Sequence, residues 1–339
     1  MRALRLHGPN NLRLDEVAPP TPAAEIVAIE VTASGVCGSD IHFVDGSART
    51  DHVPITLGHE IAGRILTDPT GTFAPGTEAV AEVGRFCLSC PRCIEGRANL
   101  CERAQILGIQ VDGGFAEQVA VPVESVVLRP SGVTDGAAAT AVDAGATALH
   151  AIERRAKVTT GESVLIIGAG GLGTYGIQWA RANGAGAILV ADTDPSALER
   201  AAALGVDDTI LVEAAVSLGR QVKLLTNGGV DAAVEFVGAA STVDAAVKSI
   251  RPGGRAVAVG VGPQPLQSLP VVLWSTHEYS LLGSYGSLSG DVERVLDALA
   301  TGTVSAPETV DVPLDDAAEL LTSMAAGGRS EAGRIIIRP

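Results

Sequence analysis

The sequence predicts an α/β protein in which a doubly wound parallel sheet accompanies a second, β-rich part. Across residues 144–283, apolar strand-like runs alternate with longer helical stretches. A glycine-rich turn, GAGGLG, directly follows one of these runs and opens a helical stretch. Residues 1–143 differ, because glycine and proline separate many short strand-like runs there. The alternation in residues 144–283 is typical of a parallel sheet covered on both faces. The short strand-like runs in residues 1–143 are typical of a barrel or sandwich.

Length and composition bound the class of protein. The 339 residues suffice for about two domains. The chain is 46% hydrophobic and 19% charged, which is typical of a globular protein. Its net charge of −15 makes nucleic acid and anionic membranes poor partners. The N-terminus lacks a signal-peptide pattern, and no apolar run of about 18 residues could cross a bilayer, so we expect a cytoplasmic protein.

Short strands dominate the first part of the chain. They are predicted at residues 2–7, 25–35, 61–68, 78–83, 115–122 and 126–130. Glycine and proline between them mark turns. We therefore place a first, β-rich domain at residues 1–143.

The middle of the chain reads as alternating strands and helices. The predicted strands are residues 163–168, 187–192, 233–238, 256–262 and 279–284, and the clearest helices are 171–184 and 195–205. Strands rich in Val, Ile and Leu that alternate with helices indicate a parallel sheet. Residues 144–283 are therefore expected to form a second domain.

The last part carries two predicted helices, 291–302 and 314–328, and a closing strand at 333–339. We expect residues 284–339 to return to the first domain. The second domain would then be an insertion between two parts of the first.

The glycine-rich turn has the features of a dinucleotide site. Gly168 permits the tight turn, Gly170 lets the backbone approach a pyrophosphate, and Gly173 lets helix and strand pack closely. Gly171 and Leu172 open the helix, whose N-terminus attracts phosphate.

The next predicted strand ends at Asp192, where a carboxylate would bind the ribose hydroxyls and repel a 2′-phosphate. The turn and Asp192 together favour NAD over NADP. The alternative for Asp192 is a solvated turn residue.

Four of the five cysteines lie close together, with the spacing C-x2-C-x2-C-x7-C. They are Cys87, Cys90, Cys93 and Cys101. Four thiolates on one loop can close a tetrahedral structural zinc site. Disulfides and an iron–sulfur cluster are the alternatives, although a ferredoxin-type spacing is not seen. We predict structural zinc.

Three further residues of metal-binding type are far apart in sequence. They are Cys37 in GVCGSDIH, His59 in GHE and Asp143 in VDAGATALH. Nothing local shows that they meet. By themselves, His59 could be a satisfied core histidine and Asp143 a helix N-cap.

The order of these motifs resembles the zinc-dependent medium-chain alcohol dehydrogenases over essentially the whole chain. The resemblance rests on GVCGSDIH, GHEIAG, the four-cysteine loop, GAGGLG and GRIIIRP. It implies a GroES-like catalytic domain over 1–143 with 284–339, and a Rossmann NAD-binding domain over 144–283. It also implies zinc, two ions per chain, and NAD as cofactors.

The resemblance also assigns the catalytic zinc ligands. Cys37 and His59 match two of them, and the third, most often cysteine in the family, falls on Asp143. Aspartate is a competent zinc ligand. Glu60 matches the nearby carboxylate, which can exchange with the water at the zinc.

Two residues match the family's proton relay. Ser39 corresponds to the hydroxyl that takes the alcohol proton, and His42 to the outer end of the relay. The alternatives are a capping hydroxyl for Ser39 and an exposed loop histidine for His42. Thr147 and Arg334 match residues at the cofactor, with Arg334 reaching the pyrophosphate.

The leading function is therefore hydride transfer between an alcohol and NAD, giving an aldehyde or ketone. A reductase of an iminium or conjugated double bond is the alternative within the fold. A non-catalytic dinucleotide- or zinc-binding protein is the alternative from another class. The expected partners are a small alcohol or carbonyl substrate and further copies of the chain, as a homodimer or homotetramer.

Overall fold

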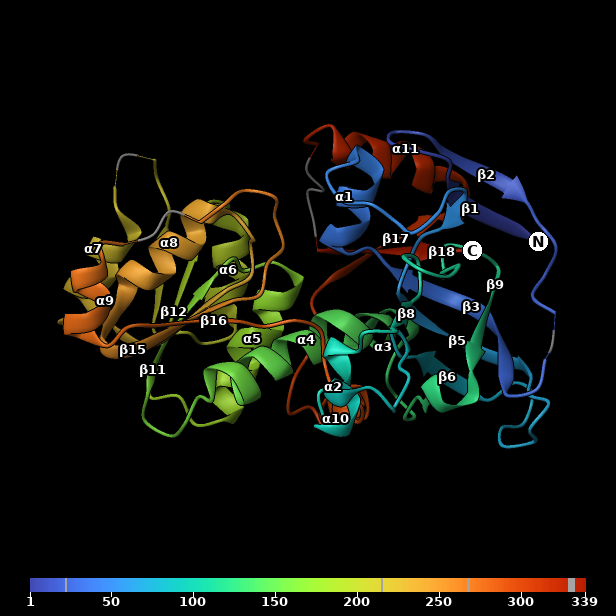
Figure 1. Cartoon of the computed structure of the whole chain (residues 1–339), viewed down its shortest axis with the longest axis horizontal. Helices are drawn as coiled ribbons and strands as arrows, with labels where there is room; N and C mark the ends of the chain where they lie inside the picture. The colour runs from blue at the N-terminus through green and yellow to red at the C-terminus, as the bar shows by residue number, and fades with distance from the viewer. Residues whose placement is uncertain (22, 215, 267–268, 329–332) are drawn as a thin grey trace. The chain divides into compact units, whose positions relative to one another are not determined.

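The computed structural model describes residues 1–339 except 22, 215, 267–268 and 329–332. The chain forms two compact units: unit 1 is Met1–Ala146 with Ser287–Pro339, and unit 2 is Thr147–Gly286 (Figure 1). The boundaries between the units lie a few residues C-terminal of those expected at 143 and 283. No helix in the described part of the chain is long and apolar enough to cross a membrane.

Unit 2 contains a parallel sheet with the strand order β13-β12-β11-β14-β15-β16. Its strands are β11 (Ser163–Ile167), β12 (Ala187–Asp192), β13 (Asp208–Leu211), β14 (Val230–Glu235), β15 (Ile250–Ala258) and β16 (Ser280–Gly283). The order reverses direction between β11 and β14, which makes the carboxyl ends of these strands the topological switch point. The predicted fold class is confirmed.

Helices surround this sheet (Figure 1). They are η4 (His150–Ala156), α5 (Gly171–Ala182), α6 (Pro195–Ala203), α7 (Leu218–Leu225), α8 (Ala240–Ser249) and α9 (Val271–His277). Side chains such as Leu165, Leu189 and Val222 are buried in one cluster between sheet and helices. The start of α6 shows how sequence sets such an element. Asp194 accepts a hydrogen bond from the Ser196 backbone, and Pro195 occupies the first turn.

Unit 1 is built mainly from antiparallel strands. One sheet has the order β10-β6-β5-β3-β18-β17 with β9 also paired to β3, a second is β2-β1-β4, and a third is β7-β8. The strands are β1 (Arg2–Leu6), β2 (Leu12–Glu16), β3 (Ile26–Gly35), β4 (Ile55–Thr56), β5 (Glu60–Thr67), β6 (Glu78–Ala81), β7 (Gly84–Arg85), β8 (Gln105–Ile106), β9 (Gln118–Pro122), β10 (Val126–Leu128), β17 (Thr309–Pro313) and β18 (Arg334–Arg338). β18 lies between β3 and β17, so a late part of the chain completes a sheet begun near the N-terminus.

Two helices cover one end of unit 1 (Figure 1). α1 (Gly38–Asp45) and α11 (Leu314–Ala325) pack together. Phe43 of α1 and Leu321 of α11 are buried in one cluster with Phe115. This packing fixes α1, which begins directly after Cys37 and carries Ser39 and His42.

Other helices of unit 1 are short, apart from α10 (Asp291–Ala300). They are α2 (Pro91–Ile94), η1 (Ala98–Leu100) and η2 (Val123–Ser125). A longer helical run begins with α3 (Asp135–Thr140) and continues through the π-helical turn η3 (Ala141–Gly145) into α4 (Ala146–Leu149). The Thr134 side chain caps the start of α3, so Asp143 lies inside this run and is not its N-cap.

Candidate metal centres and cofactor-binding turn

Unit 1 brings the three separated metal-binding side chains together. Cys37 directly precedes α1, His59 directly precedes β5, and Asp143 lies in η3. Oδ2 of Asp143 lies 3.3 Å from Sγ of Cys37 and 3.6 Å from Nε2 of His59. The three ligand atoms lie within 4.8 Å of one another.

The start of α1 fixes the backbone of Cys37 and so orients its side chain. Cys37 is the N-cap residue of α1, and its backbone N–H donates to Oδ2 of Asp40 at 2.9 Å. This is the reciprocal arrangement of a capping box. The other oxygen of Asp40, Oδ1, lies 3.8 Å from Nδ1 of His59. Asp40 thus faces two of the three predicted ligands from a fully buried position.

A glycine sets the approach to His59. Gly58 has φ = 93°, a conformation that glycine adopts readily, and a Cβ there would lie 2.5 Å from the ring of Phe115. The chain can therefore turn over Phe115 into β5 only without a side chain at this position. His59 emerges from the turn toward Asp143.

The Cys37–His59–Asp143 cluster has the dimensions of a zinc site. Zinc–ligand distances of about 2.0–2.3 Å with tetrahedral angles place neighbouring ligand atoms about 3.4–3.6 Å apart. The two distances from Asp143 agree with that spacing. A thiolate, an imidazole and a carboxylate are suitable zinc ligands, and three of them leave a fourth position for water or substrate.

The electrostatics of the cluster also fit a cation. Burial raises the pKa of the Cys37 thiol, and the Asp143 carboxylate raises it further. Burial opposes protonation of His59, but Asp40 and Asp143 outweigh it and leave the His59 pKa well above its ordinary value. Zinc binding requires the thiolate and the neutral imidazole, and a divalent charge would favour both.

Glu60 and Arg334 form a buried ion pair beside this cluster. Glu60 is fully buried, and its Oε2 accepts a hydrogen bond from the Arg334 guanidinium. Burial raises the pKa of Glu60, while the charge of Arg334 opposes this shift. Arg334 is 9% exposed. Its expected contact with the cofactor pyrophosphate stays a prediction, and in this structure its partner is Glu60.

The residues of the predicted proton relay lie on α1. Oγ of Ser39 lies 3.8 Å from Sγ of Cys37, and the Ser39 side chain is partly exposed. Nδ1 of His42 lies 3.0 Å from Oγ of Ser47. Ser39 is therefore close to the candidate metal site, and His42 is partly exposed one turn further along the helix.

The second candidate metal site is the four-cysteine loop. The four sulfur atoms of Cys87, Cys90, Cys93 and Cys101 lie within 4.8 Å of one another. Sγ of Cys101 lies 3.4 Å from Sγ of Cys87 and 4.0 Å from Sγ of Cys90, and the sulfur atoms of Cys87 and Cys93 are 3.9 Å apart. Four ligands at about 2.3 Å from a tetrahedral zinc would be about 3.8 Å apart, so the loop fits a structural zinc with no open position.

Hydrogen-bond donors converge on these sulfur atoms. The Cys90 backbone donates to Sγ of Cys87 at 3.3 Å, and the Arg103 backbone donates to Sγ of Cys101 at 3.4 Å. Nη2 of Arg103 lies 3.4 Å from Sγ of Cys87 and 2.8 Å from Oγ of Ser89. Hydrogen bonding, with the Ser89 backbone first, lowers the pKa of Cys87 to about 5. These donors stabilise the thiolate form of Cys87, the form that zinc requires.

In unit 2, the glycine-rich turn joins β11 to α5. Gly168 has φ = 90°, and a Cβ on Gly173 would overlap the Gly168 carbonyl oxygen. Gly170 is the N-cap residue of α5, with Gly171 and Leu172 in its first turn. The turn follows β11 at the switch point, where ligands bind in folds of this type.

Asp192 closes the same edge of the sheet at the end of β12. Its Oδ2 accepts the Ala169 backbone N–H at 2.7 Å, and Oδ1 accepts the Asp194 N–H at 2.9 Å. These bonds hold the carboxylate beside the glycine turn. Thr147, the other expected cofactor residue, is buried in α4 at the start of unit 2.

The structure places Asp40 and Arg103 at the two sites, where sequence reasoning gave Asp40 only a structural role and Arg103 none. The position of Asp40, three residues after Cys37, is the sequence feature that indicates its role, because this spacing fits a capping box. Arg103 has no such feature, because nothing in the spacing of the cysteines requires a cation two residues after the last of them.

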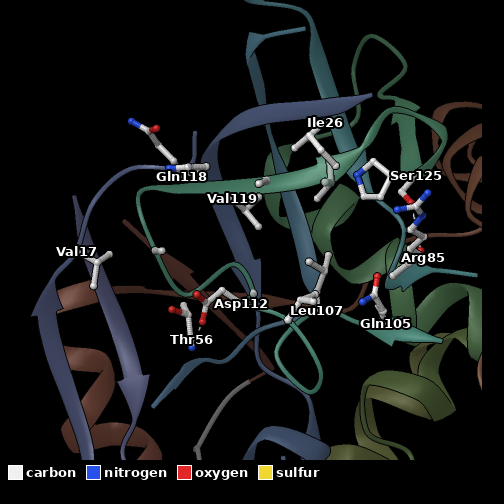
Figure 2. Close-up of a pocket in the computed structure, with 18 of the residues that line it drawn as sticks. Val17, Ile26, Thr56, Arg85, Gln105, Leu107, Asp112, Gln118, Val119 and Ser125 are labelled. Carbon is white, nitrogen blue, oxygen red and sulfur yellow. Dashed lines mark hydrogen bonds between the residues drawn. The ribbon is translucent and has the colours of Figure 1, made fainter. Parts of the chain in front are cut away.

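A separate cavity of about 520 Å³ lies elsewhere in unit 1. Figure 2 shows Thr56 and Asp112 on one side of it and Arg85 and Gln105 on the other. Its described lining includes Glu82 but neither the Cys37 cluster nor the four cysteines. The cavity is therefore distinct from both candidate metal sites.

Comparison with known proteins agrees with these features. Models of the alcohol dehydrogenase GroES-like domain and of the zinc-binding dehydrogenases match residues 23–131 and 171–301. Sorbitol dehydrogenase of Bacillus subtilis (strain 168) is 31% identical to this chain, and the match covers 91% of this chain and 89% of the sorbitol dehydrogenase. An NAD-dependent alcohol dehydrogenase of Saccharolobus solfataricus is 29% identical, covering 96% of both chains. A Sinorhizobium meliloti 1021 protein, solved bound to NADP, superposes with a TM-score of 0.90 at 28% identity, covering 100% of this chain and 99% of that one.

The fold and the site define an oxidoreductase that uses zinc and a nicotinamide dinucleotide. The chain belongs to the zinc-dependent medium-chain alcohol dehydrogenases. It acts in zinc-dependent oxidation and reduction of alcohols or polyols and the corresponding carbonyl compounds.

Proposed function

We propose that the chain is an NAD-dependent dehydrogenase with two zinc ions, which oxidises a small alcohol to an aldehyde or ketone. The observation that carries this proposal is the buried Cys37–His59–Asp143 cluster, whose ligand atoms lie within 4.8 Å. Polyols are the first substrates to try, because one relative is a sorbitol dehydrogenase.

In this proposal Cys37, His59 and Asp143 hold the catalytic zinc. When bound, zinc polarises the alcohol oxygen and lowers the pKa of the hydroxyl, and NAD accepts the hydride. Asp40 faces the Nδ1 side of His59 at 3.8 Å, and its negative charge favours an Nδ1–H that leaves Nε2 free to bind the metal. The three side chains leave the fourth position open to substrate.

Ser39 accepts the hydroxyl proton in the oxidation direction. Its Oγ lies 3.8 Å from Sγ of Cys37, so it would be close to an alcohol held by the metal ligands. His42 passes the proton to solvent from its partly exposed position on α1. A positioned acid–base pair of this kind contributes typically about 100- to 10,000-fold to a rate.

We propose NAD over NADP because the Asp192 carboxylate lies beside the glycine turn. A negative charge there repels a 2′-phosphate and accepts hydrogen bonds from ribose hydroxyls. The relative described as NAD-dependent supports this choice. The neighbour solved with NADP makes the cofactor preference a necessary part of the test.

Two further proposals follow from the four-cysteine loop and from the sheet edge. Zinc-binding thiolates must stay reduced, which supports a cytoplasmic location.

β16 is an edge strand of the unit 2 sheet, and the nearby α9 exposes Val271 and Val272. An open edge with exposed apolar side chains supports a homodimer or homotetramer.

The deciding experiment measures zinc content and NADH formation with the purified chain. We expect about two zinc ions per chain, one for each type of site. We expect NADH to appear with at least one member of a panel of primary, secondary, cyclic and polyol alcohols. NADPH should form far more slowly with the same alcohol.

Three outcomes would count against the proposal. One zinc per chain, with Cys37 reacting freely with thiol reagents, would remove the catalytic zinc. Reduction of a conjugated double bond or iminium without any alcohol oxidation would favour the alternative reductase. Equal use of NADP would contradict the role given to Asp192.

A further inference from the structure

We infer that Glu60 is a positioning residue that anchors the π-helical turn carrying Asp143, and that Gly35 provides the space this anchor needs. The inference rests on the proposed catalytic zinc. It gives Glu60 a role different from the exchange with zinc-bound water that the family resemblance implies. It also assigns a function to Gly35, the first residue of GVCGSDIH, to which the resemblance gave no role of its own.

Glu60 connects two parts of unit 1 through its two carboxylate oxygens. Oε2 pairs with the guanidinium of Arg334 on β18. Oε1 accepts the backbone N–H of Ala144 at 3.3 Å. Glu60 is fully buried, so these contacts hold the carboxylate without competition from bulk water.

The bond to Ala144 acts on the third ligand. Ala144 directly follows Asp143 within the π-helical turn η3. Its N–H lies in the peptide group that joins it to Asp143, so its orientation is linked to the backbone of Asp143. Fixing this N–H therefore limits the positions of Oδ2 of Asp143 relative to Cys37 and His59.

Gly35 makes this arrangement possible. It lies opposite Glu60 in the antiparallel β3–β5 pair, and it is also opposite Ile336 of β18. A Cβ built on Gly35 would overlap Oε2 of Glu60 and lie 3.0 Å from its Cβ. Any side chain at position 35 would therefore push the carboxylate away from Arg334 and Ala144.

The geometry also explains why Arg334 is buried. A buried carboxylate without a partner is strongly destabilising, so Glu60 needs a cation close by. Arg334 supplies this charge from β18, the neighbour of β3. The Arg334 backbone N–H is held in turn by the Glu308 carbonyl at 2.7 Å.

The test measures zinc affinity in the full-length protein loaded with both zincs. A chelating indicator competes for the metal in the wild type and in the variants Glu60→Ala, Gly35→Ala and the double variant. Loss of residues that orient metal ligands typically costs roughly 10- to 100-fold in metal affinity. We expect a loss of this size for one of the two zinc ions in each single variant.

The double variant distinguishes an effect that acts through displacement of Glu60 from a nonspecific effect on the fold. If Gly35→Ala acts by displacing the Glu60 carboxylate, its effect should be smaller once Glu60 is alanine, because only the 3.0 Å contact with the Cβ then remains. The visible spectrum of cobalt placed in the Cys37 site should change in both single variants. The zinc of the four-cysteine loop is an internal control, because its affinity should stay at the wild-type value.

Gly38→Ala is the matched control. Gly38 lies next to Cys37, and a Cβ built on it meets nothing within 4 Å. The zinc affinity of the Gly38→Ala variant should equal that of the wild type. Should Gly35→Ala fail to fold, Glu60→Ala alone still tests the anchor.

Wild-type zinc affinity in Glu60→Ala would overturn the inference. The inference would also be overturned if Gly35→Ala lowered zinc affinity by the same factor in the Glu60→Ala background as in the wild type. Equal loss of both zinc ions would overturn it as well. None of these readouts requires alcohol oxidation. A protein that binds two zincs but oxidises no alcohol would therefore refute the proposed function and leave this inference testable.

Discussion

Sγ of Cys37 lies 3.3 Å from Oδ2 of Asp143, although 106 positions separate the two residues. The proximity depends on α1 beginning at Cys37 and on η3 placing Asp143 on the same side of unit 1. It makes Asp143 the natural third partner of Cys37 and His59. The first prediction tests that role.

Asp143→Ala should reduce the zinc content by one ion per chain. It should lower kcat/KM by roughly 100-fold or more, because metal stabilisation of developing charge supplies several kcal/mol. Binding of NADH, followed by its fluorescence, should be unchanged. Asp143→Cys is the matched control, since a thiolate is also a zinc ligand and should retain the metal. An alanine variant that keeps both zinc ions would show that Asp143 is not a ligand.

Cys101→Ser should remove the other zinc. The loop between Cys87 and Cys101 has few buried side chains, so metal binding supplies much of its folding energy. We expect faster proteolysis within this loop and a free energy of unfolding lower by about a few kcal/mol. Ser89→Ala, in the same loop, should keep the zinc. Unchanged zinc content in Cys101→Ser would exclude the four-cysteine site.

Asp192→Asn should weaken discrimination between NAD and NADP. Hydrogen bonds to a charged group contribute about 1.5–3 kcal/mol, which corresponds to roughly 10- to 100-fold in the ratio of the two kcat/KM values. Steady-state kinetics with both cofactors measure this ratio. Asp208→Asn, at the exposed start of β13, should leave it unchanged. Equal effects of the two substitutions would argue against a ribose contact.

Glu82 should make the stability of the fold depend on pH. Burial raises the pKa of Glu82 from 4.5 to about 7, with the Gly290 backbone N–H opposing this shift and Asp291 adding to it. Because the folded-state pKa is raised, the stabilisation is complete below about pH 4.5 and is lost as the pH rises through about 7. At about 1.4 kcal/mol per pKa unit, the loss is at most about 3.5 kcal/mol.

Glu82→Gln should remove this dependence, because an amide mimics the protonated acid. Denaturant unfolding at pH 5 and pH 8 is the measurement, and the variant should be more stable than the wild type only at the higher value. Glu30→Gln, at an exposed position of β3, should follow the wild type at both. A Glu82→Gln variant that gains nothing at pH 8 would refute the prediction.

The sequence was most informative where burial leaves a regular pattern. The buried strands β11 and β12 and the amphipathic helices α10 and α11 were predicted close to their observed bounds, whereas β14 was predicted three residues too late. Elements with little buried surface were not identified. β17 is almost entirely exposed, and only Ile210 of β13 is buried, so their pairing in the fold and not their composition defines them.

The site shows the same division. Motif spacing indicated the four-cysteine loop and the glycine turn, because each is local. The contact between Glu60 and Gly35 depends on the register of β3 and β5, and the contact with Arg334 depends on where β18 joins the sheet. Such relations are set by tertiary pairing, which a single sequence does not display.

The position of β18 between β3 and β17 has a consequence for synthesis. During translation, all of unit 2 leaves the ribosome before β17 and β18 do, so unit 2 can fold while unit 1 still lacks two strands of its main sheet. Until then β3 presents an open edge where β18 will pair, and edges of this kind attract other chains. Nascent unit 1 is therefore open to pairing with other chains at this edge until β18 is made. The Glu60 carboxylate meets Arg334 only when this last strand arrives.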